Sequence, residues 1–412
     1  MPEAKERKQS PRLFLPAKPS DLVLWCVHNV LRFSLPFRNR VHIHERDLDM
    51  LRRLPPGAGI ILTPNHADEA DPTVCLELSR RCRRRFIFMG NREAFDEYRG
   101  AAGWGMQRIG VFSVERGGHD VAAKNFAVDI TRLGKDVLVI FPEGEIFYLN
   151  DSVQPFHSGA VDIGLQAVIE ERKQRPDWDA YLVPMAIKYS YARPITKLLE
   201  RRVQEMEKRL SRDMSGYALR KRLVLLLSEL LQREELAHKV QSDSDRYAQL
   251  TDRVTRVRHA VLAELELKYA GVAAAQARTI DRAWQISDHV RDMMNEATAM
   301  HRLQYQQDLN SLQDVAHMVS WKPEYINDNP SEERLAEVVL KLEREVFRIK
   351  RPRPLGVRNV FLQIGEPLPL SQFLSDYQTT PHVVRHNVAE QLREKIQSLI
   401  DSISVANSVI QQ

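Results

Sequence analysis

The sequence predicts an α/β fold: a mixed, largely parallel sheet flanked by helices, with an α-helical bundle insertion. Three observations favour it. Short apolar runs alternate with helical patterns from about residue 57. The run at 137–141, Val-Leu-Val-Ile-Phe, is apolar throughout, which is typical of a strand buried on both faces. Residues 193–345 instead show heptad-like apolar spacing with charges of both signs between, which favours long helices.

The expected elements follow in chain order. Strands are expected at 59–63, 85–89, 111–114, 137–141 and 181–187, and helices at 72–82, 119–133 and 157–172. Within the helical stretch, breaks are expected near 242–245, around Gly271 and at Pro323. A strand at 357–364 and a C-terminal amphipathic helix then resume the α/β pattern. The apolar stripe of that helix comprises Val384, Val388, Leu392, Ile396 and Leu399.

This pattern divides the chain into four parts. Residues 1–45 are expected to form a basic tail and an amphipathic membrane-docking segment, and 46–192 an α/β core. Residues 193–350 are expected to be a helical insertion, and 351–412 the closing strand and last helix of the core. A length of 412 residues with 43% hydrophobic and 28% charged side chains is enough for such a large core.

Composition also bounds the location. No apolar run reaches the length of a membrane span, and the N-terminus lacks a signal-peptide pattern, so we expect neither. Three cysteines, Cys26, Cys75 and Cys82, without C-x-x-C spacing argue against a disulfide framework and favour a reducing compartment. Composition by itself therefore predicts a protein without a membrane span in a reducing compartment.

The net charge of +5 is concentrated at one end of the chain. Residues 1–40 hold eight Lys and Arg against three acids, and the rest of the chain is balanced. This distribution argues against a general nucleic-acid binder. A basic tail beside the half-apolar stretch 22–37 favours an anionic membrane surface, at about 1 kcal/mol per basic residue.

The first candidate site, Asn65-His66 followed by Asp71-Pro72, comes directly after the expected strand 59–63. Its letters D-E-A-D do not indicate a helicase, because the chain has no phosphate-binding G-x-x-x-x-G-K-[ST] loop. Residues five apart in a helix point about 140° away from each other, so His66 and Asp71 meet only across a loop. Asp-Pro favours a helix start there. The carboxylate would then orient His66 as a base. The alternative is a helix cap beside a solvated histidine.

Three other pieces carry possible chemistry. Phe141-Pro142-Glu143-Gly144 ends a second buried strand, so it should lie at the same sheet edge as His66. Arg116-Gly117 follows the strand at 111–114, where a guanidinium suits a phosphate. Val183-Pro184 begins a further apolar strand. Taken singly, these pieces are better explained as a plain turn, a solvated arginine in a glycine turn and a buried strand, respectively.

Together, in this order and at these intervals, the four pieces resemble the glycerophospholipid acyltransferase family, the lysophosphatidic-acid acyltransferase type. That family carries N-H-x(4)-D, Arg-Gly, F-P-E-G and V-P motifs. The resemblance covers about residues 40–192, and Gly365-Glu366-Pro367 resembles the closing strand of the family over 355–375. The sequence departs from the pattern at Asp68, where the family often has Ser, and at Glu145-Ile146, where it often has Thr-Arg or Thr-Ser.

The resemblance implies acyl transfer from a thioester, acyl-CoA or acyl carrier protein, to a hydroxyl of a glycerol-phosphate lipid. It also implies a peripheral enzyme on the cytoplasmic side of a membrane. His66 would be the general base and Asp71 its orienting partner, with no cofactor and no metal. Arg116 with Gly117, Glu143 with Gly144, and Asn65 would form the acceptor site. The absence of a G-x-S-x-G elbow agrees with direct attack by the hydroxyl.

Two alternatives stay open at this point. The chain could be a non-catalytic lipid-binding or scaffold protein built on an acyltransferase platform, or an acyltransferase with a non-phosphate acceptor. The helical part could cap the site, bind membrane through 223–227, or dimerise; capping or packing is our expectation. Trp284 is expected to lie in the core of the helical bundle rather than in a pocket.

Overall fold

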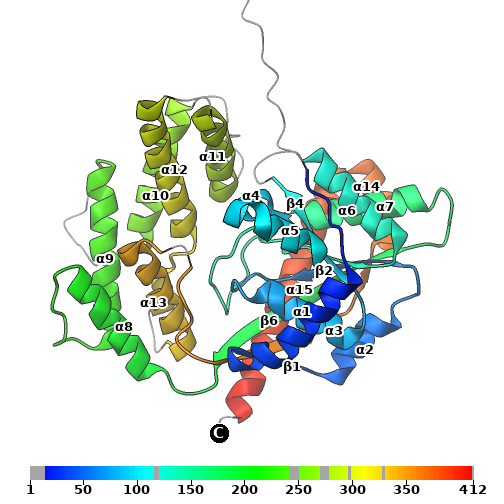
Figure 1. Ribbon diagram of the computed structural model, residues 1–412, viewed down its shortest axis with the longest axis horizontal. Helices are drawn as coiled ribbons and strands as arrows, with labels where there is room; N and C mark the ends of the chain where they lie inside the picture. Colours follow the sequence, from blue (N-terminus) through cyan, green and yellow to red (C-terminus); the bar gives the residue numbers. More distant parts are fainter. Residues whose placement is uncertain are drawn as a thin grey trace, which may run out of the picture.

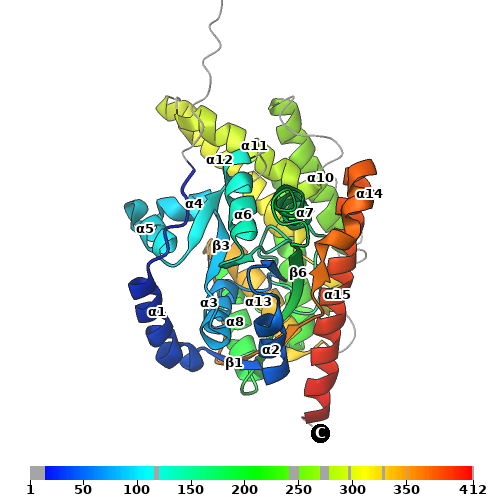
Figure 2. The ribbon, with the colours of Figure 1, turned by 90° about the vertical axis from the view of Figure 1, so that its right-hand side faces the viewer.

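The computed structural model describes residues 14–115, 120–240, 250–269, 278–295, 298–326, 330–349 and 351–410. An α/β core and a helical segment lie side by side (Figure 1). In the view turned by 90°, the long C-terminal helix runs along one side of the core and the first helix along the other (Figure 2).

One mixed, largely parallel sheet of eight strands forms the centre of the core, which confirms the predicted fold class. Seven strands lie in the order β1-β7-β6-β2-β5-β3-β4, and β8 pairs with β6. Neighbours are parallel except at the β6–β7 and β6–β8 pairs. The strands are β1 (Asn39–Ile43), β2 (Gly59–Pro64), β3 (Phe86–Asn91), β4 (Val111–Val114), β5 (Val137–Val139), β6 (Ala180–Tyr191), β7 (Arg358–Ile364) and β8 (Leu368–Pro369).

The apolar runs located the central strands, whereas β1 was not predicted. Every residue of β2 is buried, as expected for a strand covered on both faces. In β1 only Asn39 is buried, because this strand lies at the edge of the sheet and pairs with β7 alone. Its mostly polar sequence therefore carries no apolar signal. Strand β6 is longer than predicted and extends to Tyr191, where it still pairs with β7.

Helices cover both faces of the sheet, because successive strand residues point to opposite sides. Ile61 and Leu138 pack toward α6 (Val121–Leu133), α7 (Gly159–Glu171) and α15 (Pro381–Ile410). Ile60 and Leu62 pack toward α1 (Asp21–Ser34), α2 (Glu45–Arg53) and α3 (Asp71–Cys82). The short helices α4 (Arg92–Asp96) and α5 (Ala101–Arg108) connect β3 to β4, and α14 (Leu374–Thr379) precedes α15.

In the described residues of 193–350, six α-helices, α8 to α13, form the helical segment, which has its own apolar core. It lies between β6 and β7, which are neighbours in the sheet. The helices are α8 (Thr196–Arg209), α9 (Leu219–Ala237), α10 (Leu250–Lys268), α11 (Thr279–Asn295), α12 (Ala299–Val319) and α13 (Glu332–Phe347). A 3-10 turn begins at Pro323, where a break was expected, whereas the other two expected breaks lie outside the described residues.

The idea that 223–227 presses into a membrane is wrong for this structure. Leu223, Leu226 and Leu227 are buried in the core of the helical segment. Arg222, which directly precedes this stretch, pairs with Glu207 in a buried ion pair. Among the described helices, none combines the length and the apolar character that crossing a bilayer requires.

Candidate active site

His66 and Asp71 meet across the loop that joins β2 to α3. Strand β2 ends at Pro64, and α3 begins at Asp71 with Pro72 in its first turn. His66 Nδ1 lies 2.9 Å from Asp71 Oδ2. The imidazole stacks on the Phe141 ring, with centroids 4.0 Å apart. The expected contact between the two side chains is therefore present, and neighbouring strands fix the plane of the imidazole.

Three donors surround the Asp71 carboxyl group, which is fully buried. Oδ2 accepts from His66 Nδ1 and from the Asp68 N–H, and Oδ1 accepts from the Tyr189 hydroxyl at 2.5 Å. Burial raises the pKa of Asp71, and the hydrogen bonds from His66 and Tyr189 oppose that rise. A carboxylate is the form that accepts only, so three donors fit ionised Asp71. Ionised Asp71 holds the proton of the neutral imidazole on Nδ1. Nε2 then carries a lone pair and can accept a proton from a donor group in the cavity.

A buried ion pair braces this loop from the far end of the chain. Arg358 of β7 donates to both oxygens of Asp68, at 2.7 and 2.9 Å. The same guanidinium lies over the Tyr189 ring, 4.3 Å from its centroid, and donates to Asn39. The pattern described above often has Ser at the position of Asp68. In this chain the carboxylate of Asp68 is explained by its ion pair with Arg358.

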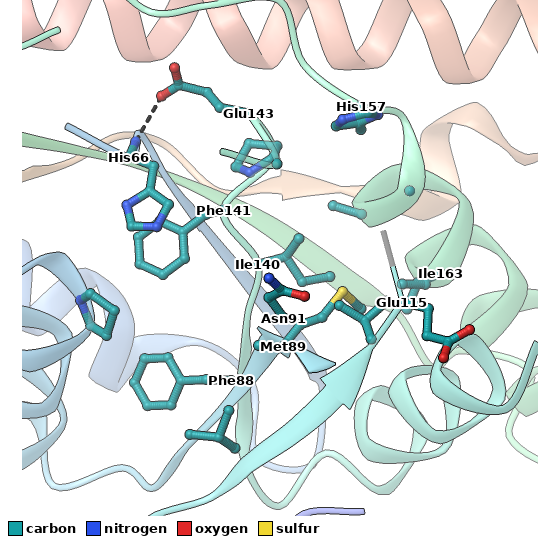
Figure 3. Close-up of a pocket in the computed structure, with 18 of the residues that line it drawn as sticks. His66, Phe88, Met89, Asn91, Glu115, Ile140, Phe141, Glu143, His157 and Ile163 are labelled. Carbon is teal, nitrogen blue, oxygen red and sulfur yellow. Dashed lines mark hydrogen bonds between the residues drawn. The ribbon is translucent and has the colours of Figure 1, made fainter. Parts of the chain in front are cut away.

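Glu143 fastens the two loops of the site to each other. Its Oε1 accepts from the His66 backbone N–H at 2.7 Å, as Figure 3 shows, and its Oε2 accepts from the Gln154 N–H at 3.1 Å. Burial raises the pKa of Glu143 to about 8, against the opposing effect of these two hydrogen bonds. Both oxygens are thus engaged by the backbone, which favours a positioning role for Glu143 beside the acceptor contact that we expected.

Gly144 and Asn65 occupy tight positions next to this carboxyl group. Gly144 has φ +75°, and a Cβ added there would lie 2.7 Å from the His157 ring, so only glycine fits without strain. Asn65 is 1% exposed, and its side chain both donates to and accepts from the backbone of Ile187. This geometry favours Asn65 as a brace between the loop and β6 over the substrate contact that the sequence suggested.

A mostly apolar cavity of about 640 Å³ opens beside His66. Figure 3 shows Phe88, Met89, Ile140 and Ile163 along it; the first two belong to β3, Ile140 directly follows β5, and Ile163 belongs to α7. The following residues also line it: Leu76, Met106, Ile109, Val111, Val114 and Ala160. A cleft of this size with few polar groups is typical of a small-molecule or acyl-chain site.

The helical segment also contributes to this cavity. Ile280, Asp281, Trp284 and Gln285 of α11 line it. The expectation that Trp284 belongs to the core of the bundle is wrong: it lies at the boundary between the segment and the α/β core. Sequence periodicity gave no sign of this, because it cannot tell which face of a helix meets another domain.

Two of the predicted acceptor residues, Arg116 and Gly117, lie outside the described residues. The described chain reaches Glu115, which lines the cavity (Figure 3). The expected phosphate contact of Arg116 therefore stays a prediction.

Two other groups of side chains could in principle react or bind a metal, but their surroundings do not favour it. Burial raises the pKa of the Cys75 thiol well above its usual value, so this cysteine does not supply a thiolate. In the described part of the chain, Asp314, His317 and Glu345 are spaced as a metal could require. Their carboxylates already contact Arg348 and Arg344, so the protein itself supplies the positive charge.

Comparison with known proteins bears on the region that holds this site. Residues 42–188 match the model of the acyltransferase family. No curated protein matched the chain. The matched region includes β2, the loop with His66 and Asp71, the loop with Glu143, and most of β6.

Proposed function

Starting from the acyltransferase domain at residues 42–188, we propose that this enzyme moves a fatty acyl group from a thioester to a hydroxyl of a glycerol-phosphate lipid. The observation that carries the proposal is the His66–Asp71 pair at the edge of the apolar cavity. Nδ1 of His66 is held by the buried carboxylate, and Nε2 makes no hydrogen bond to any residue that the structure describes. The pair is thus poised as a general base beside a site for an alkyl chain.

The reaction then needs no enzyme nucleophile. Nε2 of His66 takes the proton of the acceptor hydroxyl while its oxygen attacks the thioester carbonyl. The tetrahedral intermediate collapses, the carbon–sulfur bond breaks, and the imidazolium returns its proton to the leaving thiolate. The products are an ester and a free thiol. Asp71 stabilises the imidazolium that forms between the two proton transfers.

The acceptor and the donor are proposed on the sequence pattern. Arg116 and Gly117 would hold the phosphate of the acceptor, because a guanidinium forms paired hydrogen bonds with phosphate oxygens. The donor would be acyl-CoA or acyl carrier protein. The helical segment would be an insertion into the acyltransferase fold, since the family match ends at residue 188 and the sheet resumes at Arg358.

Thiol release tests this function directly. Purified protein is incubated with acyl-CoA and lysophosphatidic acid, and free thiol and the diacyl product are followed. Turnover should disappear in His66→Ala and persist in His44→Ala, a matched change at an exposed histidine. Turnover with phosphate-free acceptors alone would contradict the role of Arg116. Lipid binding without turnover on any acceptor would favour a scaffold.

An exposed apolar surface on α1 and α5 supports peripheral attachment to a membrane. The surface consists of Leu22, Trp25 and Phe33 of α1, Phe37 of the 3-10 turn that follows α1, and Trp104 of α5, each between 61% and 79% exposed. Backbone hydrogen bonds from Lys18 and Ser20 attach the chain just before α1 to the C-terminal end of α5. Figure 2 shows α1 and α5 on the same side of the core. Such an apolar patch marks an interaction site.

Charge beside the α1–α5 apolar surface indicates an anionic lipid. Arg32 lies over the Phe33 ring and Arg108 over the Trp104 ring, each 5.8 Å from the ring centroid. Helix α5 also supplies Met106 to the cavity wall, so the proposed membrane face and the acyl site share one helix.

Vesicle sedimentation measures this attachment. Phe33→Glu should weaken binding to anionic vesicles several-fold, and high salt should weaken binding of the wild type. Leu267→Glu, at a position that is 83% exposed on α10, is the matched control and should bind normally. Equal binding of Phe33→Glu and the control would contradict the docking face.

A further inference from the structure

Helix α11 closes the cavity from outside the acyltransferase domain. Ile280 and Trp284 lie one helical turn apart, so they point to the same side of α11. Ala283, Ile286 and Val290 lie on an adjacent face, about 100° further around the helix, and are fully buried in the core of the helical segment. One face of α11 therefore belongs to the segment, and the adjacent face completes the wall of the cavity.

Two polar anchors hold α11 across the α/β core. At its N-terminal end, Arg278 donates to the Pro155 carbonyl oxygen and to His157, and Asp281 lies 3.4 Å from His157 Nε2. At its C-terminal end, Arg291 pairs with Glu93 of α4 at 2.5 Å. His157 itself lines the cavity, and α4 directly follows β3, whose Met89 and Asn91 line it too.

One anchor is at His157 and the other lies next to the end of β3, and these are different parts of the cavity lining. Ile280 and Trp284 lie between the two anchors along α11. In Figure 1, α11 lies next to α4, in agreement with the Arg291–Glu93 pair. Helix α11 is thus fixed at both ends over an apolar site. Its apolar contribution to that site is one large aromatic and one branched aliphatic side chain, which are groups that contact an alkyl chain favourably.

We propose that α11 is the outer wall of the acyl-chain site, and that Trp284 and Ile280 determine which acyl chain lengths the enzyme accepts. The inference rests on the proposed acyl transfer and gives the helical segment a part in it. An apolar pocket discriminates chains that differ by one methylene about 10- to 200-fold at most. A change in wall volume at Trp284 should therefore change chain-length selectivity by an amount that is easily measured.

Binding of S-alkyl-pantetheine thioethers with about 8 to 18 carbons tests the wall without catalysis. These probes contain the part that acyl-CoA and acyl carrier protein share, and they cannot transfer an acyl group. Trp284→Ala should favour longer chains, with the ratio of long-chain to medium-chain affinity rising about tenfold or more. Leu303→Ala, at an exposed position of α12 in the same segment, should keep the wild-type ratio. An unchanged ratio in Trp284→Ala would overturn the proposal.

A charge exchange tests the placement of α11 independently of the tryptophan. Glu93→Arg and Arg291→Glu should each reduce chain-length selectivity, and the double exchange should restore it. Failure of the double exchange to restore a selectivity that both single variants lose would also overturn the proposal. Thiol release is measured separately, so the two failures can be told apart. Absence of turnover in the wild type refutes the proposed reaction. A ratio of long-chain to medium-chain affinity that is the same in Trp284→Ala and the wild type refutes the role of α11.

Discussion

Replacing Tyr189 with phenylalanine isolates the support that Asp71 receives from β6. The Tyr189 hydroxyl reaches Oδ1 at 2.5 Å, whereas the His66 and Asp68 donors reach Oδ2. Asp71 has no exposed surface, so water does not take the place of the lost hydroxyl. A hydrogen bond to a charged group contributes about 1.5–3 kcal/mol. Ionised Asp71 should be destabilised by about that amount.

The sign of the effect follows from the pKa. Burial already raises the pKa of Asp71, and loss of a donor to the ionised form acts in the same direction. The pKa of Asp71 should therefore rise further in Tyr189→Phe. In the proposed reaction ionised Asp71 stabilises the imidazolium, so kcat/KM should fall about ten- to hundredfold and should fall most at low pH.

The assay is thiol release measured from about pH 5 to 9. The acid limb of the Tyr189→Phe profile should move to higher pH. Tyr181→Phe, at the start of the same strand, removes a hydroxyl away from the site and should follow the wild-type profile. A Tyr189→Phe profile that superimposes on the wild type would refute the idea that this hydroxyl supports Asp71.

Two further predictions concern buried charges. Arg358→Leu leaves Asp68 without its charged partner and should lower the free energy of unfolding by about 3–5 kcal/mol. Adding Asp68→Asn should recover part of this loss in chemical denaturation. Strictly additive losses from the two substitutions would argue against coupling between the two residues. Glu143, with a pKa raised from 4.5 to about 8, keeps in the folded state a proton that the unfolded chain loses. Its stabilising contribution is therefore complete below about pH 4.5 and is lost as pH rises through about 8, at about 1.4 kcal/mol per pH unit. The difference in unfolding free energy between wild type and Glu143→Gln should follow that slope, and a constant difference would mean that the carboxyl group is ionised throughout.

Local signals in the sequence were sufficient for the central strands and for the His66–Asp71 pair. A continuous apolar run marks a strand buried on both faces, as β2 and β5 are. Asp-Pro marks the start of a helix, and α3 does begin at Asp71. These features depend on neighbours within a few residues, so the sequence alone carries them.

The partners of the site residues came only from the tertiary structure. Tyr189 reaches Asp71 across 118 positions of sequence, and Arg358 reaches Asp68 across 290. The carboxyl group of Glu143 was expected to face the acceptor, yet both of its oxygens accept backbone N–H groups. A sequence shows that such groups are polar; only packing decides which donor lies within hydrogen-bond distance of each one.

The sequence by itself therefore determined the α/β architecture, the position of the acyltransferase motifs and the separate helical character of residues after β6. The tertiary structure decided that this helical segment meets the cavity beside His66, through Trp284 on one face of α11. The physical reason is that helical periodicity specifies how far apart apolar faces lie on a helix, but not which surface each face covers. That choice depends on the anchors at Glu93 and His157, which lie more than a hundred residues earlier in the chain.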